Sequence, residues 1–129
     1  MISIDEMEKM LDELASELPE EFYKELNGGI ILLPETKFHN NKNADDLYIL
    51  GEYHQEVSLG RYICIYYGSF LKVYGYLSKD KIRPQLRKVL RHEFRHHLES
   101  LAGERLLEIE DEQYILDYLK RYNHTNRSS

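Results

Sequence analysis

Apolar residues recur every three or four positions over the first part of the chain, with mostly Asp and Glu between them. The recurring residues are Ile4, Met7, Met10, Leu11, Leu14 and Leu18. This spacing predicts an amphipathic helix. We expect Ser3 or Asp5 to cap its start and Pro19 to end it. The acidic residues after Pro19 favour a second short helix that runs to Leu26.

Three short apolar runs farther along the chain are typical of strands. The first run, residues 30–33, follows a Gly-Gly turn signal, and such a run between turn residues indicates a buried strand. Residues 47–53 and 61–67 are rich in Tyr, Ile and Leu, which favour sheets. The polar segment 35–46 predicts an exposed loop. Together these runs predict a small sheet.

Helical spacing returns after Gly75. The apolar residues of this stretch are Ile82, Leu86, Val89, Leu90, Phe94, Leu98 and Leu101. Ser78 or Asp80 is the expected cap, and Pro84 is expected in the first turn. The helix should end near Gly103, because glycine readily adopts the left-handed conformation that closes many helices.

Two features of the C-terminal part complete the predicted architecture. Residues 111–122 have the pattern of another helix, and residues 123–129 are polar and predict a flexible tail. No linker or internal repeat divides the sequence. We therefore predict a single domain over residues 1–122, in which helices flank a small sheet.

Composition narrows the class of protein. The 129 residues include 17 Lys plus Arg and 23 Asp plus Glu, so the formal charge is 17 − 23 = −6, which argues against a broad nucleic-acid surface. With one cysteine, Cys64, no intrachain disulfide can form. No apolar run approaches the roughly 20 residues of a membrane helix, and the N-terminus lacks a positive leader. These features predict a cytoplasmic protein with no membrane segment.

The residues with the clearest chemistry are His92, Glu93 and His96, which form a His-Glu-x-x-His pattern on the long helix. Residues four apart lie one turn above each other, so the two imidazoles can bind one metal ion from the same face. Glu93 can reach a water in the open metal position and accept its proton. Imidazole ligands with a carboxylate partner indicate zinc (Zn²⁺), and this chemistry is amide hydrolysis. His97 lies about 100° farther round the helix and is expected to be a packed residue rather than a ligand.

The spacing of the residues does not decide which group is the third metal ligand. Glu99 shares the face of His96, and Glu104 follows Gly103, where a turn could return it to the metal. Glu110 and Asp111 start the next predicted helix, whose packing could direct Asp111 at the ion. The remaining candidates are Glu108, a water, or no third ligand.

Several segments resemble a family of small bacterial metallopeptidase-like proteins called minimal zincins, formerly a domain of unknown function. The resemblance implies a compact α+β zincin-like fold, with the sheet packed on the motif helix. It also implies zinc on His92 and His96, with Glu93 as general base in peptide-bond hydrolysis. A peptide or protein substrate follows from that activity. The matching segments are 11–14, 18–22, 50–53, 61–66, 89–93 and 96–97.

The sequence departs from the family pattern after the second histidine. Where the family has x-x-Gly-x-x-Asp, this chain has Glu99 and Ala102. Residues 99–108, about ten residues, resemble an insertion into the family pattern. Glu110 and Asp111, which follow, resemble the acidic end of the family motif. Asp111 is therefore the preferred third ligand, with Glu99, Glu104 and Glu110 as alternatives.

Other features keep a second class of function open. A basic stretch between Lys79 and Arg95 could engage an acidic partner, or the acidic N-terminal helix could neutralise it. The alternative prediction is a non-catalytic metal-binding or interaction module on a zincin scaffold. Most of the eleven tyrosines are expected to serve sheet packing, although one could donate to an oxyanion. Cys64 is expected to be a small buried hydrophobe.

Overall fold

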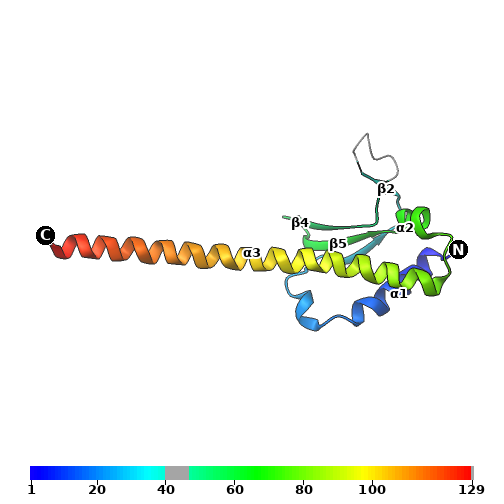
Figure 1. Ribbon diagram of the computed structural model, residues 1–129, viewed down its shortest axis with the longest axis horizontal. Coiled ribbons are helices and arrows are strands. Elements are labelled where there is room, and N and C mark those ends of the chain that lie inside the picture. The colour runs from blue at the N-terminus through cyan, green and yellow to red at the C-terminus, as the bar shows by residue number, and fades with distance from the viewer. Residues whose placement is uncertain (40–46, 129) are drawn as a thin grey trace. The chain divides into compact units, whose positions relative to one another are not determined.

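The computed structural model describes residues 1–39 and 47–128 of the chain. By their contacts, Met1–His97 form one unit and Leu98–Ser129 form a second. The first unit contains helices, strands and the start of a long helix, α3 (Figure 1). None of the described helices is long and apolar enough to cross a membrane. The fold is α+β, as predicted.

The first helix, α1 (Ile4–Ser16), confirms the helix predicted from the apolar spacing. Ser3 caps it, because its hydroxyl accepts from the backbone N–H of Glu6 at 3.1 Å and the Glu6 carboxylate accepts from the Ser3 N–H at 3.1 Å. The buried face consists of Met7, Met10, Leu11 and Leu14. After Pro19 the chain forms only a single 3₁₀ turn, η1 (Glu20–Tyr23), which is shorter than the helix expected there.

A three-stranded sheet follows, with the strand order β1-β5-β4. β1 (Gly29–Leu33) runs parallel to the central strand β5 (Gly60–Tyr66), and β4 (Gly51–Glu56) runs antiparallel to it. The strands predicted near residues 30–33 and 61–67 are thus confirmed, and β4 extends beyond the predicted run 47–53.

A second, two-stranded sheet pairs β2 (Lys37–Phe38) with β3 (Tyr48–Ile49) in antiparallel fashion. β3 occupies the start of the run that sequence reasoning assigned to one strand. β2 lies inside the segment 35–46 that was predicted to be a loop. The rest of that segment, 40–46, lies outside the described residues.

Helix α2 (Tyr67–Tyr74) was missed by the sequence analysis. Its Tyr, Phe and Val content is typical of strands, and the predicted strand before it was extended to residue 67. The helix buries Ser69 and Phe70, so packing against the interior overrides the local propensity.

Helix α3 (Lys79–Ser128) begins where predicted. The Ser78 carbonyl accepts from the N–H groups of Lys81 and Ile82, both at 3.0 Å. Pro84 lies in the second turn, not in the first turn where it was expected.

The predicted end of this helix near Gly103 is wrong, because α3 continues through it to Ser128. A glycine inside a helix costs only about 1 kcal/mol relative to alanine, and the Leu, Ala, Glu and Arg residues around Gly103 are good helix formers. The predicted separate helix over 111–122 is therefore part of α3, whose backbone also includes most of the predicted tail 123–129. A single domain over residues 1–122 stays a prediction.

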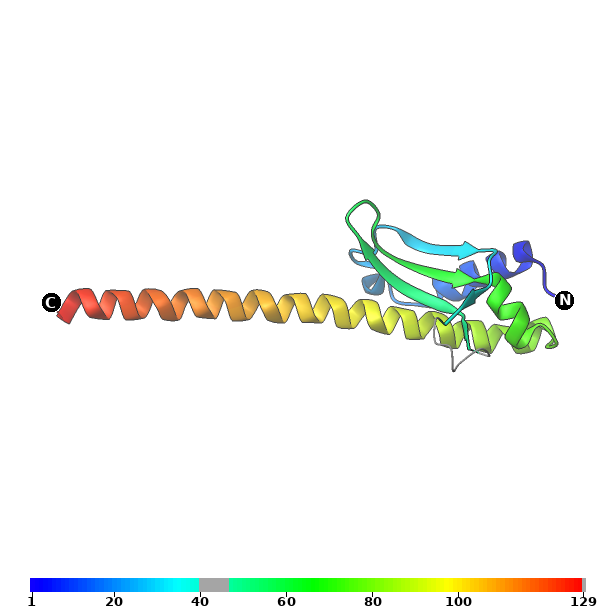
Figure 2. The same ribbon diagram turned by 90° about the horizontal axis from the view of Figure 1, so that it is seen from above.

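The hydrophobic core of the first unit lies between the sheet and two helices. α1 and the start of α3 cover the same face of the sheet (Figure 2). Strand β5 contributes Ile63 and Ile65, and α3 contributes Ile82, Leu86, Leu90 and Phe94. The alternate residues of β5, Tyr62, Cys64 and Tyr66, form a separate cluster with residues of β1 and β3.

A glycine brings the edge strand β4 close to the long helix. A Cβ added at Gly51 would lie 2.9 Å from Cγ1 of Val89 and 3.2 Å from Cδ1 of Ile65. Any larger residue would therefore push the strand away from α3. Val89 stands one helical turn before Glu93, so this close approach places the sheet edge next to the His-Glu-x-x-His segment.

Candidate metal centre

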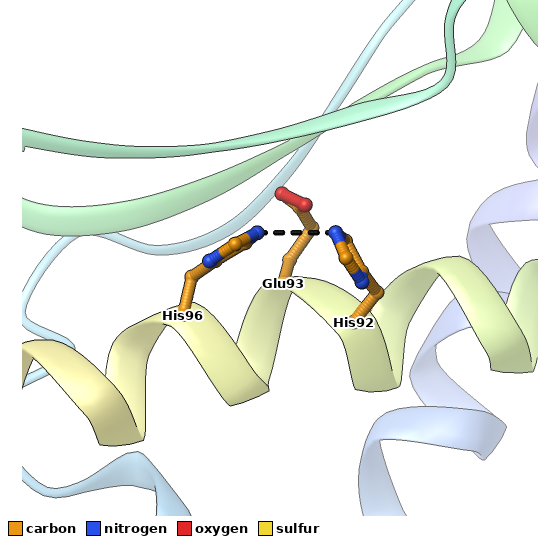
Figure 3. A group of neighbouring side chains, drawn as sticks. All are labelled: His92, Glu93 and His96. Atoms are coloured by element: carbon orange, nitrogen blue, oxygen red, sulfur yellow. Dashed lines mark hydrogen bonds between the residues drawn. The ribbon is translucent and has the colours of Figure 1, made fainter.

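His92 and His96 project from successive turns of α3 and face each other (Figure 3). Their Nε2 atoms are 3.0 Å apart, and the ring planes are inclined by 86° with centroids 4.6 Å apart. Both side chains are exposed. A ligand could therefore reach both nitrogens from solvent.

The spacing of these nitrogens fits a tetrahedral metal ion. Two imidazole nitrogens bound to zinc at about 2.05 Å with a tetrahedral angle are about 3.3 Å apart, which is close to the 3.0 Å between the two Nε2 atoms. The hydrogen bond between the rings requires a proton on one nitrogen, and a metal ion would take the place of that proton.

Glu93 completes the group from the buried side. Its carboxylate lies within 4.8 Å of the ligand nitrogens of both histidines, and it projects between the two rings towards the sheet (Figure 3). The residue is only 4% exposed. Burial raises the pKa of the Glu93 carboxyl, although the neighbouring His96 and His92 act in the opposite direction.

His97 is fully buried at 0% exposure and uses both ring nitrogens for hydrogen bonds within the first unit. Nε2 lies 2.8 Å from the backbone oxygen of Lys24, and Nδ1 lies 2.8 Å from the hydroxyl of Tyr53. A carbonyl oxygen only accepts, so Nε2 carries the proton, and in the neutral ring Nδ1 accepts from Tyr53. The prediction that His97 is a packed residue is confirmed.

A polar network on β4 lies near the group and was not found by sequence reasoning. The carboxylate of Glu52 accepts from the ammonium of Lys37 and from the hydroxyl of Tyr66 at 2.6 Å, and it lies 3.5 Å from Nε2 of His54. Burial acts to raise the pKa of the Glu52 carboxyl, but the hydrogen bonds from Lys37 and Tyr66 outweigh it and hold this pKa below its usual value. Burial, together with the bond to Glu52, raises the pKa of Tyr66 to about 12.

The alternation of residues along the strand could have indicated this network. Gly51 and Tyr53 point towards α3 and the core, so Glu52 and His54 belong to the opposite face of the strand. The charges of Glu52 and His54 also act on Glu93, Glu52 raising and His54 lowering its pKa.

The predicted third ligand is not part of this group. Asp111 and the alternatives Glu99, Glu104 and Glu110 all belong to the second unit. Glu104 was expected to reach the ion through a turn near Gly103, and Asp111 through the packing of a separate helix, but α3 runs without a break through both residues. Asp111 as a metal ligand stays a prediction.

Several basic residues of α3 are neutralised by the acidic helix α1. Arg83 bonds Glu13 at 2.6 Å, Arg87 bonds Glu17 at 3.0 Å, and Lys79 pairs with Glu6. This is the neutralisation considered as an alternative for the basic stretch.

The remaining candidates from the sequence are buried in the sheet. Cys64 is 4% exposed, and burial raises the pKa of its thiol. It is a buried residue, as predicted. Tyr62 and Tyr66 are also buried, at 7% and 3% exposure, which agrees with a packing role.

The chain matches no family model and no curated protein. A solved structure of a conserved hypothetical protein from Thermo thermophilus is similar to it, with 33% sequence identity and a TM-score of 0.68. The match covers 79% of this chain and 99% of that chain. The chain therefore belongs to the same family as that protein.

Proposed function

We propose that the protein is a zinc-dependent metallopeptidase of the cytoplasm, with His92 and His96 as metal ligands and Glu93 as general base. The observation that carries the proposal is the 3.0 Å separation of the two Nε2 atoms beside a buried carboxylate. Imidazole nitrogens are common ligands of zinc, and a carboxylate beside the ion can serve as a base. The resemblance of the His92 to His96 segment to the minimal zincins supports the same activity.

Each residue of the group has a separate role. Zinc, when bound, supplies a Lewis acid that makes water more acidic and polarises a carbonyl oxygen. His92 and His96 hold the ion through Nε2. The carboxylate of Glu93 lies close enough to accept a proton from an attacking water and to return it to the leaving amine. Its burial keeps bulk water away from that carboxylate.

Contacts of His97 and Gly51 with neighbouring segments support a rigid metal site. The bonds of His97 to Lys24 and Tyr53 fix the turn of α3 that follows Glu93 and His96. Gly51 allows the sheet edge to lie against the preceding turn of the helix. β4 is an edge strand of the three-stranded sheet, so its free edge offers main-chain groups with which an extended peptide can pair.

Substitution of Glu93 by Gln tests the catalytic role. The variant keeps the shape of the side chain but cannot accept the proton, so it should bind zinc like the wild type and cut peptides about 10² to 10⁴ times more slowly. The assay is mass spectrometry of a mixture of short peptides incubated with each zinc-loaded protein. Gln85→Glu introduces a carboxylate elsewhere on the same helix and is not expected to restore activity in the Glu93→Gln background.

The alternative, a non-catalytic metal-binding or interaction module, predicts a different result. Zinc would bind to wild type and to Glu93→Gln equally, and neither protein would cut any peptide of the mixture. That outcome would contradict the peptidase proposal while leaving the metal site in place.

A further inference from the structure

A groove of about 420 Å³ runs along α3 next to the metal group. One wall consists of residues of β3 and β4 and the segment between them, including Ile49 and Leu50, and the other consists of α3 residues from Gln85 to Glu93. Tyr74 of α2 also lines the groove. All of these residues belong to the first unit. The groove therefore leads directly from His92 and Glu93 along two turns of the helix.

The interior of the groove is mainly apolar. Ile49, Leu50 and Val89 are partly buried and present aliphatic surface, and Tyr74 adds an aromatic ring. A volume of this size is typical of sites for small ligands. It suits a large apolar side chain of a peptide.

The charge at the groove favours an anionic ligand. Lys88 is exposed, and it forms no ion pair with any residue that the structure describes, whereas the adjacent Arg87 is bound to Glu17. The one carboxylate in the lining is that of Glu93, which belongs to the metal group. A carboxylate on the ligand would therefore meet the ammonium of Lys88 without a competing acid beside it.

The distance between Lys88 and His92 sets the length of the ligand. Four residues of helix rise about 6 Å, and an extended peptide advances about 3.3 Å per residue. A carboxylate held by Lys88 would thus lie about two residues from a peptide bond positioned at His92.

We propose that this groove binds the carboxyl-terminal end of a peptide, with a large apolar side chain between its walls and the terminal carboxylate at Lys88. This inference rests on the proposed peptidase function and gives it a substrate class. Water adds across the amide bond two residues before the end. Its oxygen bonds to the carbonyl carbon, the C–N bond breaks, and the dipeptide leaves as an amine that receives the proton through Glu93.

Calorimetric binding of defined peptides to the full-length, zinc-loaded Glu93→Gln variant tests this proposal. The peptide acetyl-Ala-Ala-Ala-Phe-Leu is compared as a free acid and as a carboxyl-terminal amide. We expect the free acid to bind at least about tenfold more tightly. Lys88→Gln should remove this preference, and Lys81→Gln should keep it, because Lys81 loses the same charge on the same helix but does not line the groove.

Three results would contradict the proposal, two of them with the wild-type residue at position 88 and one with the Lys88→Gln variant. One is equal binding of the acid and the amide. Another is tight binding of an amide whose last residue is Asp, which would assign the carboxylate to a side chain rather than to the chain end. A preference that survives Lys88→Gln would equally contradict the role of Lys88.

The binding comparison, read together with zinc binding and peptide cleavage, distinguishes a failure of the groove assignment from a failure of the peptidase proposal. The groove is formed by the protein alone, so the preference for the free acid is also expected in zinc-free wild type. If zinc binds and peptides are cut without regard to their carboxyl ends, the groove assignment fails and the peptidase proposal stands. If no zinc binds but the preference persists, the peptidase proposal fails and the groove assignment stands.

Discussion

Replacing His97 with Phe removes two hydrogen bonds from the interior of the first unit. His97 is fully buried, and its ring nitrogens lie 2.8 Å from the Lys24 carbonyl and 2.8 Å from the Tyr53 hydroxyl. Phe has nearly the same shape, so little cavity forms, but both partners lose their bonds. An unsatisfied buried polar group costs about 1 to 3 kcal/mol, and Tyr53 is only partly buried. We therefore expect a loss of about 2 to 3 kcal/mol in unfolding free energy.

Urea titration of the chelator-treated protein measures this loss. The methyl resonances of Ile63 and Ile65 report on the core of the first unit, so the second unit does not contribute to the signal. Tyr53→Phe is the matched partner substitution. It should cost about 1 kcal/mol in the wild type and close to nothing in the His97→Phe background, because its hydroxyl has already lost its partner.

Two outcomes would refute this reasoning. The first is a His97→Phe protein whose unfolding free energy lies within about 0.5 kcal/mol of wild type, the usual range for surface substitutions. The second is the same cost for Tyr53→Phe in both backgrounds. Either result would mean that His97 does not hold the motif turn of α3 through these bonds.

Three further substitutions test the electrostatics of the Glu52 network, the packing at Gly51 and the continuity of α3. Because the pKa of Glu52 is lowered in the fold, its carboxylate stabilises the protein at pH values above the ordinary pKa of 4.5, and this effect is lost as the pH falls through the folded-state pKa. Glu52→Gln should therefore flatten the fall in urea midpoint on acidification. An unchanged profile would argue against the Lys37 network. Gly51→Ala should destabilise by about 1 to 3 kcal/mol because its Cβ would meet Val89, and thermal melts should show rescue by Val89→Ala but not by Leu86→Ala. Gly103→Ala should stabilise α3 by up to about 1 kcal/mol, seen as greater helicity by circular dichroism, whereas a loss of helicity would indicate that the chain needs a break at Gly103.

Local signals in the sequence were sufficient for much of the fold. The capping box of Ser3 and Glu6 and the apolar spacing after it define α1, because both depend only on neighbouring residues. Short apolar runs likewise identified β1 and β5. Helix α2 was missed because its residues favour strands locally, and the burial of Phe70 decides the outcome through contacts with distant parts of the chain.

The same contrast between local signals and distant contacts applies to Gly103 and to the candidate site. Gly103 was interpreted as a helix end, since glycine often closes helices, but α3 passes through it at a modest cost. The pairing of His92 with His96 was predictable because helical spacing alone brings them together. The partners of His97, the Glu52 network and the groove at Lys88 depend on contacts between segments far apart in the sequence.

Zinc content is the measurement that tests the central claim most directly. Protein purified without an affinity tag is loaded with zinc, dialysed and measured by inductively coupled plasma mass spectrometry, as wild type, His96→Ala and His39→Ala. His39 is an exposed histidine outside the metal group and serves as the control. We predict one zinc ion per chain in wild type and His39→Ala, and a loss of zinc in His96→Ala. Absence of zinc from all three proteins, or full retention in His96→Ala, would contradict the metal site.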